Sequence, residues 1–254
     1  LPSQLWAYLK GILTLDLGYS YRQQRSVASL IAERLPATLV LTLTAFAIAL
    51  TGGIVLGTLA ARNAGRWIDS AISALALVCY ATPLFWIALM AVLLFSVALD
   101  WVPAFGMATV GANNTGIGNR LDVAHHLVLP SSVLGLFYIA LYTRLTRASL
   151  LEVGNQDFIR TARAKGVGER RILWVHQLRN AILPVVTMAG LQAGHLIGGA
   201  VVVETVYAWP GIGRLAFDAL LQRDYNLLLG IFFVTASLVV IFNLITDLVY
   251  GVVD

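Results

Sequence analysis

The pattern along the chain is dominated by long apolar stretches that alternate with short polar segments. A run of about 18 or more apolar residues is long enough to cross a membrane as a helix. The pattern therefore predicts five membrane-spanning helices, at about residues 37–60, 72–99, 127–150, 181–203 and 227–249. Pro36 suits a helix N-terminus, and Pro83 predicts a kink in the second helix because proline removes a backbone donor.

The composition fits a polytopic membrane protein of the all-α class. Hydrophobic residues make up 59% of the chain and charged residues only 12%, about half the charged share of an ordinary soluble domain. The net charge of +4 indicates basic cytoplasmic loops rather than a nucleic-acid surface, since Lys and Arg concentrate on the inner side of membrane proteins. The single cysteine, Cys79, excludes a disulfide within the chain.

The distribution of basic residues predicts the orientation of the helices. Residues 61–67 carry two basic side chains and no acid, and residues 152–180 carry six against three acids. The loops at 100–126 and 204–226 are nearly neutral, so the first two loops are predicted to be cytoplasmic. Five spans then leave residues 1–36 outside as an extracytoplasmic segment and put the C-terminus inside. The chain has no initiator Met, and we expect a sixth span ahead of it in the full protein.

The basic loop contains a predicted short helix at its start. The helix carries a narrow apolar stripe, formed by Phe158, Ile159, Ala162 and Gly166. Arg160 and Arg163 point away from that stripe, and Gly166 lies where a helix commonly ends. A second amphipathic stretch follows and is predicted to lie at the membrane interface, with Trp174, Val175, Leu178 and Ile182 on its apolar face.

The spacing in the loop leaves two interpretations open. A basic amphipathic helix can rest on anionic lipid headgroups. A small apolar stripe surrounded by Arg can also dock into a groove on another protein.

Four stretches of the chain together resemble the permease subunits of ABC importers. The loop DFIRTARAKGVGERRILWVHQLRNAILPVVT is similar to their EAA loop, in the form found in the dipeptide, oligopeptide and nickel branch. The others are LGYSYRQQRSVASLIAERLPATL, TRLTRASLLEV and VVVETVYAWPGIGRLAFDALLQRDY. The Glu and first Ala that name the general motif are Arg160 and Thr161 here, and only Ala162 is retained.

The resemblance implies a type I importer permease whose loop at 152–180 is coupled to a separate ATPase. Residues 37–254 would form the transmembrane permease domain. The docking helix would be carried by Phe158, Ile159, Arg160, Ala162, Arg163, Lys165 and Gly166. Its basic side chains would meet acidic or polar groups of the ATPase, and its small residues would allow a close approach. The chain has no Gly-x-x-x-x-Gly-Lys-Ser/Thr loop, so it is predicted not to be an enzyme, and ATP and Mg would be bound by the partner.

The resemblance also implies partners and a location. A second homologous permease subunit, forming a heterodimer, two ATP-binding subunits and an extracytoplasmic solute-binding protein are expected beside membrane lipid. The location would be the bacterial or archaeal inner membrane, and the solute a peptide or nickel. The choice between dipeptides, longer peptides and nickel stays open.

Polar residues inside the predicted spans are candidates for the translocation path. Gln192, His195 and Asn243 are such residues, because polar groups are costly in lipid and are commonly functional there. Hydrogen bonding between helices is the alternative role. His125 and His126 are adjacent, but the chain shows no cluster of metal ligands and no metal site is predicted.

The stretch ETVYAWPGIGR, residues 204–214, also has two interpretations. It can be an interfacial turn in which Tyr207 and Trp209 lie at the headgroups and Pro210 and Gly211 make the bend. The resemblance implies an outer loop or gate that meets the binding protein, with Glu204, Trp209, Pro210 and Gly211 as its residues. The two interpretations are compatible.

Two other classes of protein fit the sequence less well. An ion-coupled secondary transporter would need paired carboxylates within the membrane, whereas Glu204 and Asp247 lie at opposite ends of their spans. An intramembrane serine hydrolase would need a framed nucleophile. Ser237 and His195 exist, but no Gly-x-Ser-x-Gly occurs. A permease subunit is therefore the leading hypothesis.

Overall fold

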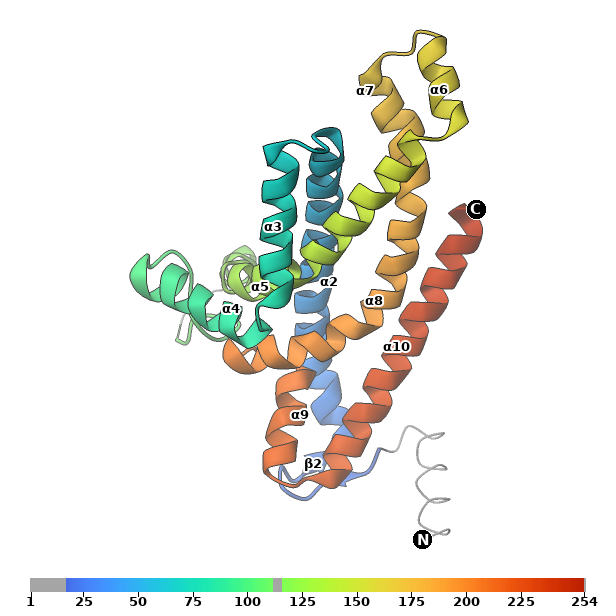
Figure 1. Ribbon diagram of the computed structural model, residues 1–254. Helices are drawn as coiled ribbons and strands as arrows, with labels where there is room; N and C mark the ends of the chain where they lie inside the picture. Colours follow the sequence, from blue (N-terminus) through green and yellow to red (C-terminus); the bar gives the residue numbers. More distant parts are fainter. Residues whose placement is uncertain (1–16, 112–115, 254) are drawn as a thin grey trace.

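The computed structural model describes residues 17–111 and 116–253, without the side chains of 193–197, 246, 247 and 249–253. Helices dominate the described chain (Figure 1). In chain order the helices are α2 (Val27–Arg62), α3 (Trp67–Ala81), α4 (Leu84–Ala91), η1 (Val92–Ala98), α5 (Ile117–Gly154), α6 (Asp157–Ala164), α7 (Glu169–Arg171), η2 (Ile172–Gln177), α8 (Leu178–Val206), α9 (Ile212–Leu221) and α10 (Tyr225–Val253). A hairpin of two short strands, β1 (Tyr19–Ser20) and β2 (Arg25–Ser26), precedes them.

The first long helix begins ten residues earlier than the sequence pattern predicted. Ser26 caps α2, because its side-chain oxygen accepts the backbone N–H of Ser29 at 3.3 Å. Pro36 therefore lies inside α2 and not at its N-terminus, so that prediction was wrong. Residues 27–36, assigned from sequence to the N-terminal segment, form the first turns of this helix.

The hairpin lies against the start of α10, at the opposite end of the molecule from α6 (Figure 1). The Ser20 hydroxyl donates to the carboxylate of Asp224. The other oxygen of Asp224 accepts the backbone N–H of Leu227 at 3.2 Å, in the first turn of α10. One buried carboxylate thus joins the hairpin to the beginning of the last helix.

Pro83 breaks the second predicted span instead of kinking it. The axes of α3 and the α4–η1 segment differ by 104°. Thr82 is extended, with ψ of 133°, since a residue before proline is driven away from the helical region. Pro83 then begins a new helix, where its missing N–H is not needed.

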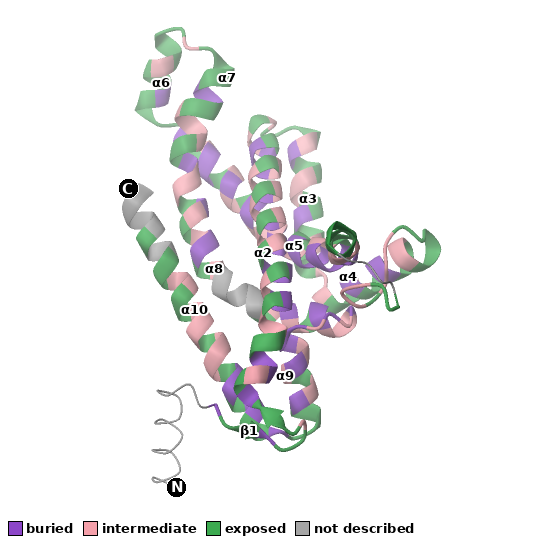
Figure 2. Cartoon of the chain, turned by 180° about the vertical axis from the view of Figure 1, so that it is seen from behind, coloured by how far each residue is buried: buried purple, intermediate pink, exposed green. Residues whose placement is uncertain are grey.

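The pair α2 and α5 forms the centre of the molecule, and its small residues allow the helices to pack very closely. A Cβ built on Gly53 would lie 2.3 Å from the Cβ of Tyr142, and one on Gly57 would lie 2.6 Å from that of Thr146. Glycines four apart on one helix face are a common means of close packing in membranes. The main apolar core surrounds this contact, while much of the outward surface of α3, α4 and α10 is exposed and apolar (Figure 2).

Each of the five predicted spans corresponds to helical structure in the described chain. Three of these helices are long and apolar enough to cross a membrane, namely α2, α5 and Tyr225–Ile245 of α10, and the bent α3–η1 pair can supply a fourth. The helix α5 also includes residues 117–126, which the sequence pattern assigned to a loop.

The second amphipathic stretch of the basic loop is continuous with α8 and does not form a separate helix. The segments α7, η2 and α8 follow one another without interruption from Glu169 to Val206. Within η2 the buried residues are Ile172 and Leu173, whereas Trp174 and Val175 of the predicted apolar face are exposed.

Candidate functional site

The short helix α6 ends where the sequence predicted, and a glycine ends it. Gly166 has φ of +77°, a conformation that costs little only for glycine. The Gly166 N–H donates to the carbonyl of Arg163 at 2.9 Å, and the Val167 N–H donates to that of Ala162 at 3.2 Å. This pair of bonds is a Schellman motif, in which backbone donors beyond the helix satisfy its last carbonyls.

The inner face of α6 packs onto its own chain. Ile159 is fully buried, in a small apolar cluster completed by Leu150, Val153, Ile172, Leu173 and Ala181. Ala162 and Val167 pack against the same cluster. The apolar stripe predicted to contact a partner therefore divides. Ile159 holds α6 to the ends of α5 and α8, and it is not available on an outer docking face.

The outer face of α6 carries the remaining predicted residues. Phe158 is 42% exposed. Arg160, Lys165 and Gly166 are also exposed. The helix projects beyond the ends of α2 and α3 (Figure 1), so this face is open to another molecule.

The basic residues of α6 are not all free for a partner. Arg163 forms an ion pair with Glu169 of α7, with Nε 2.8 Å from Oε1. Arg160 lies 3.4 Å from Asp157 on an exposed surface, where such a pair contributes little. Within the described chain, Lys165 forms no ion pair. Arg163 thus braces the turn after α6, while Arg160 and Lys165 stay accessible.

A bidentate ion pair links the first turn of α3 to the C-terminal half of α5. Arg147 donates through Nε to one oxygen of Asp69 at 2.6 Å and through Nη2 to the other at 2.7 Å. The Gly65 N–H also donates to Asp69, at 3.0 Å. The sequence pattern alone did not identify the partner of Arg147. The signal that could have found it is a lone acid in the first turn of an otherwise apolar helix.

The stretch at 204–214 is a turn between two helices, built around a buried carboxylate. Glu204 is fully buried at the end of α8. The Thr38 hydroxyl donates to Glu204 Oε1 at 2.7 Å, and the Arg214 N–H donates to Oε2 at 3.0 Å. Thr38 Oγ1 also accepts the N–H of Ile212 at 2.8 Å. The carboxylate thereby caps α9 and ties it to α2.

The aromatic residues of this turn are inside the protein, so the prediction that they lie at the headgroups was wrong. Trp209 is fully buried and donates from Nε1 to the carbonyl of Ala37 at 2.9 Å. Tyr207 donates its hydroxyl to the carbonyl of Ala88 at 3.1 Å. Pro210 is half-buried in the turn. A Cβ on Gly211 would come within 2.2 Å of the Glu204 carboxyl carbon, so only glycine fits there.

The candidates for a translocation path lie on α8 and α10, two helices that contact each other. Gln192 is half-exposed, and the side chain of His195 lies outside the described residues. The Oδ1 atom of Asn243 is buried and has no hydrogen-bond partner within the described chain. Among the residues that the structure describes, no group of three or more His, Cys, Asp or Glu could hold a metal ion. His125 and His126 bond instead to nearby carbonyls.

These features define a helical membrane permease subunit with a braced, projecting helix at one end. Residues 53–254 match the family described as the binding-protein-dependent transport system inner membrane component. The chain belongs to that family, which favours the permease hypothesis over a secondary transporter.

Curated relatives agree over nearly the whole chain. The oligopeptide transport system permease protein AppB of Bacillus subtilis is 43% identical over 252 residues, 99% of this chain and 78% of that protein. The dipeptide transport system permease protein DppB of Escherichia coli K12 is 40% identical over 264 residues, which cover 97% of this chain and 78% of the DppB chain.

Solved structures show the same fold at low sequence identity. The MetNI methionine ABC transporter in an inward-facing conformation is 17% identical, with a TM-score of 0.70 over 89% of this chain and 96% of the other. An amino acid ABC transporter with histidines is 16% identical, with a TM-score of 0.58 over 88% and 92%. The predicted type I importer permease fold is confirmed.

Proposed function

We propose that this chain forms half of a translocation path for peptides and is driven by a separate ATPase that docks on the outer face of α6. The observation that carries the proposal is the rigid attachment of α6. Its Ile159 is fully buried between the ends of α5 and α8, and Arg163 is paired to Glu169. A projecting helix can transmit a displacement into a membrane domain only if it moves together with the helices that it contacts.

Displacement of α6 would reach the path through two connections. The buried cluster beneath α6 includes Leu150 of α5 and Ala181 of α8. The Asp69–Arg147 pair then joins α5 to α3. Movement of α6 would therefore be shared by three helices. ATP and Mg would be bound by the ATPase subunits, and a second permease subunit and a solute-binding protein would complete the transporter.

The orientation proposed is the one with α6 in the cytoplasm. The basic turn between α2 and α3 and the helix α6 lie at the same end of the molecule, and α10 ends toward that side (Figure 1). The β hairpin and α9 lie at the opposite end (Figure 1). A common basic side agrees with the preference of Lys and Arg for cytoplasmic loops.

Peptides are proposed as the solute because two relatives that match nearly all of the chain are named for oligopeptide and dipeptide transport. Nickel is the weaker candidate, since the described residues contain no cluster that could hold a metal ion. A deletion strain that expresses this chain with its partners should take up a labelled dipeptide or oligopeptide. Uptake of nickel without uptake of either peptide would contradict the proposed solute.

Docking on α6 can be tested by the substitution Phe158→Ala. The exposed part of a Phe side chain that becomes buried in an interface is worth about 1–2 kcal/mol, so affinity for the ATPase subunit should fall roughly 5- to 30-fold. Phe217→Ala is the matched control, because Phe217 lies on α9 and is 39% exposed. Equal affinity of both variants and the unsubstituted protein, measured by co-purification at graded concentrations, would place the docking surface elsewhere.

A further inference from the structure

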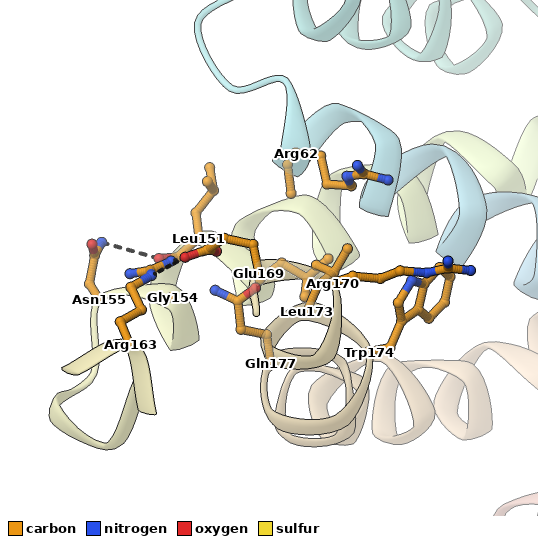
Figure 3. A pocket seen from close by; sticks show the side chains of 12 residues that line it. Arg62, Leu151, Gly154, Asn155, Arg163, Glu169, Arg170, Leu173, Trp174 and Gln177 are labelled. Atoms are coloured by element: carbon orange, nitrogen blue, oxygen red, sulfur yellow. Dashed lines mark hydrogen bonds and ion pairs between the residues drawn. The ribbon is translucent and has the colours of Figure 1, made fainter. Parts of the chain in front are cut away.

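A cleft lies between the inner ends of α2, α5 and the α7–η2 segment, beside the helix α6. Its volume is about 790 Å³. Side chains from all three elements converge on it in Figure 3. It is separate from the outer face of α6, to which docking is assigned above.

The cleft carries an excess of positive charge. Arg62, Arg163 and Arg170 line it together with a single acid, Glu169. Glu169 is already paired with Arg163, whose Nε and Nη2 lie 2.8 and 3.4 Å from its two carboxylate oxygens. Neither Arg62 nor Arg170 has an acidic partner among the described residues. Two guanidinium groups therefore face the cleft without a counter-charge.

Apolar side chains (Ala61, Leu151 and Trp174) and the amides of Asn155 and Gln177 form the rest of the cleft lining. Leu150 and Leu173 are buried behind it. Trp174 is 51% exposed and lines the cleft, as does Arg170. Trp67, at the nearby start of α3, is 78% exposed. Exposed Trp residues are typical of the boundary between the hydrocarbon core and the headgroups, so the cleft lies at a depth that lipid headgroups reach.

We propose that this cleft binds the phosphate of an anionic phospholipid headgroup, with Arg62 and Arg170 as its ligands and the Trp174 wall against the glycerol and the first carbons of the acyl chains. A cleft lined by both cationic and apolar side chains fits an amphiphilic anion better than a free phosphate ion. A lipid bound there connects the end of α2 to the α7–η2 segment. The assignment of this lipid to the cytoplasmic leaflet rests on the proposed orientation of the permease.

The test uses the assembled transporter in nanodiscs that contain phosphatidylglycerol, phosphatidylcholine or a mixture, with retained lipids counted by native mass spectrometry. The double variant Arg62→Gln/Arg170→Gln removes both ligands. The control Arg66→Gln/Arg171→Gln removes the same charge from the same two loops, at exposed residues that do not line the cleft.

The unsubstituted transporter should retain phosphatidylglycerol in preference to phosphatidylcholine. Each basic contact to an anionic lipid contributes about a fivefold preference. The preference for phosphatidylglycerol over phosphatidylcholine should therefore fall roughly 30-fold in the double variant and less than about threefold in the control. Equal loss in both variants would show only a general surface potential, and absence of any preference would leave the cleft without a lipid; either result overturns the proposal.

Two further arms separate other occupants from a lipid. Inorganic phosphate at millimolar concentration should not displace the retained phosphatidylglycerol, and full displacement would mean that the cleft takes a soluble anion. The double variant should still co-purify with its ATPase subunits. Loss of the ATPase with lipid retention unchanged would make the cleft a protein contact and overturn the lipid assignment. Failure of docking at Phe158 would leave the lipid measurement untouched, so the two proposals fail separately.

Discussion

The buried carboxylate of Glu204 provides the sharpest test of how the turn at 204–214 is held. It accepts hydrogen bonds from the Thr38 hydroxyl and the Arg214 N–H, at 2.7 and 3.0 Å. Each hydrogen bond to a charged group contributes about 1.5–3 kcal/mol, and a buried donor left unpaired costs about 1–3 kcal/mol. Glu204→Ala should therefore destabilise the protein by about 3–5 kcal/mol.

Glu204→Gln should cost much less. The amide keeps one oxygen that can accept the N–H of Arg214, and its NH2 group can donate to the Thr38 oxygen. Loss of the charge and of ideal geometry should cost about 1–2 kcal/mol. For a chain of this size about 1 kcal/mol shifts the melting temperature by roughly 2–4 °C. The expected decreases are then roughly 6–20 °C for the alanine variant and 2–8 °C for the glutamine variant.

The measurement is thermal unfolding of the purified transporter in detergent, followed by intrinsic fluorescence. Glu33→Ala is the control, because Glu33 is half-exposed and pairs with Arg25 at the surface, where an ion pair contributes at most about 1 kcal/mol. If Glu204→Ala unfolds within about 2 °C of the unsubstituted protein, the carboxylate does not hold α8, α9 and α2 together, and the reasoning fails.

Two further predictions concern the end of the molecule that carries α6. Gly166→Val forces a β-branched side chain into a left-handed conformation at a cost of about 1–2 kcal/mol or more, and it should weaken ATPase association and uptake. Gly168→Ala is the control, because φ is −63° there and no atom lies within 4 Å of an added Cβ; it should leave both association and uptake unchanged. Equal effects of the two substitutions would contradict the role of the turn. A double-mutant cycle on Asp69→Ala and Arg147→Ala, read from thermal unfolding, should give a coupling energy of about 1–3 kcal/mol; additive effects would mean that the bidentate pair does not stabilise the α3–α5 contact.

Local signals in the sequence predicted the end of α6 correctly. A glycine after a short amphipathic stretch indicates a C-terminal cap, and Gly166 adopts φ of +77° with both bonds of the Schellman motif. The break at Pro83 was also visible, but its size was not. Proline reports that a hydrogen bond is lost, whereas the 104° between α3 and α4–η1 depends on what the second helix packs against.

The candidate site was predicted less completely because periodicity says which residues share a face and not what that face contacts. Phe158 and Ile159 belong to one predicted stripe. In the folded chain Phe158 is exposed and Ile159 is fully buried in a cluster with residues of α5, η2 and α8. Trp209 was predicted at the headgroups from its amphipathic chemistry, which is equally satisfied by a buried carbonyl, that of Ala37.

The sequence by itself determined the class of this protein, the presence of its long apolar helices and the family to which it belongs, because apolar length, charge bias and short motifs are local properties. Only the tertiary structure decided which polar groups pair. Arg147 meets Asp69 across 78 residues, and Thr38 meets Glu204 across 166. Buried polar groups must find partners to offset the loss of water, and that requirement leaves the choice of partner to the packing of the helices.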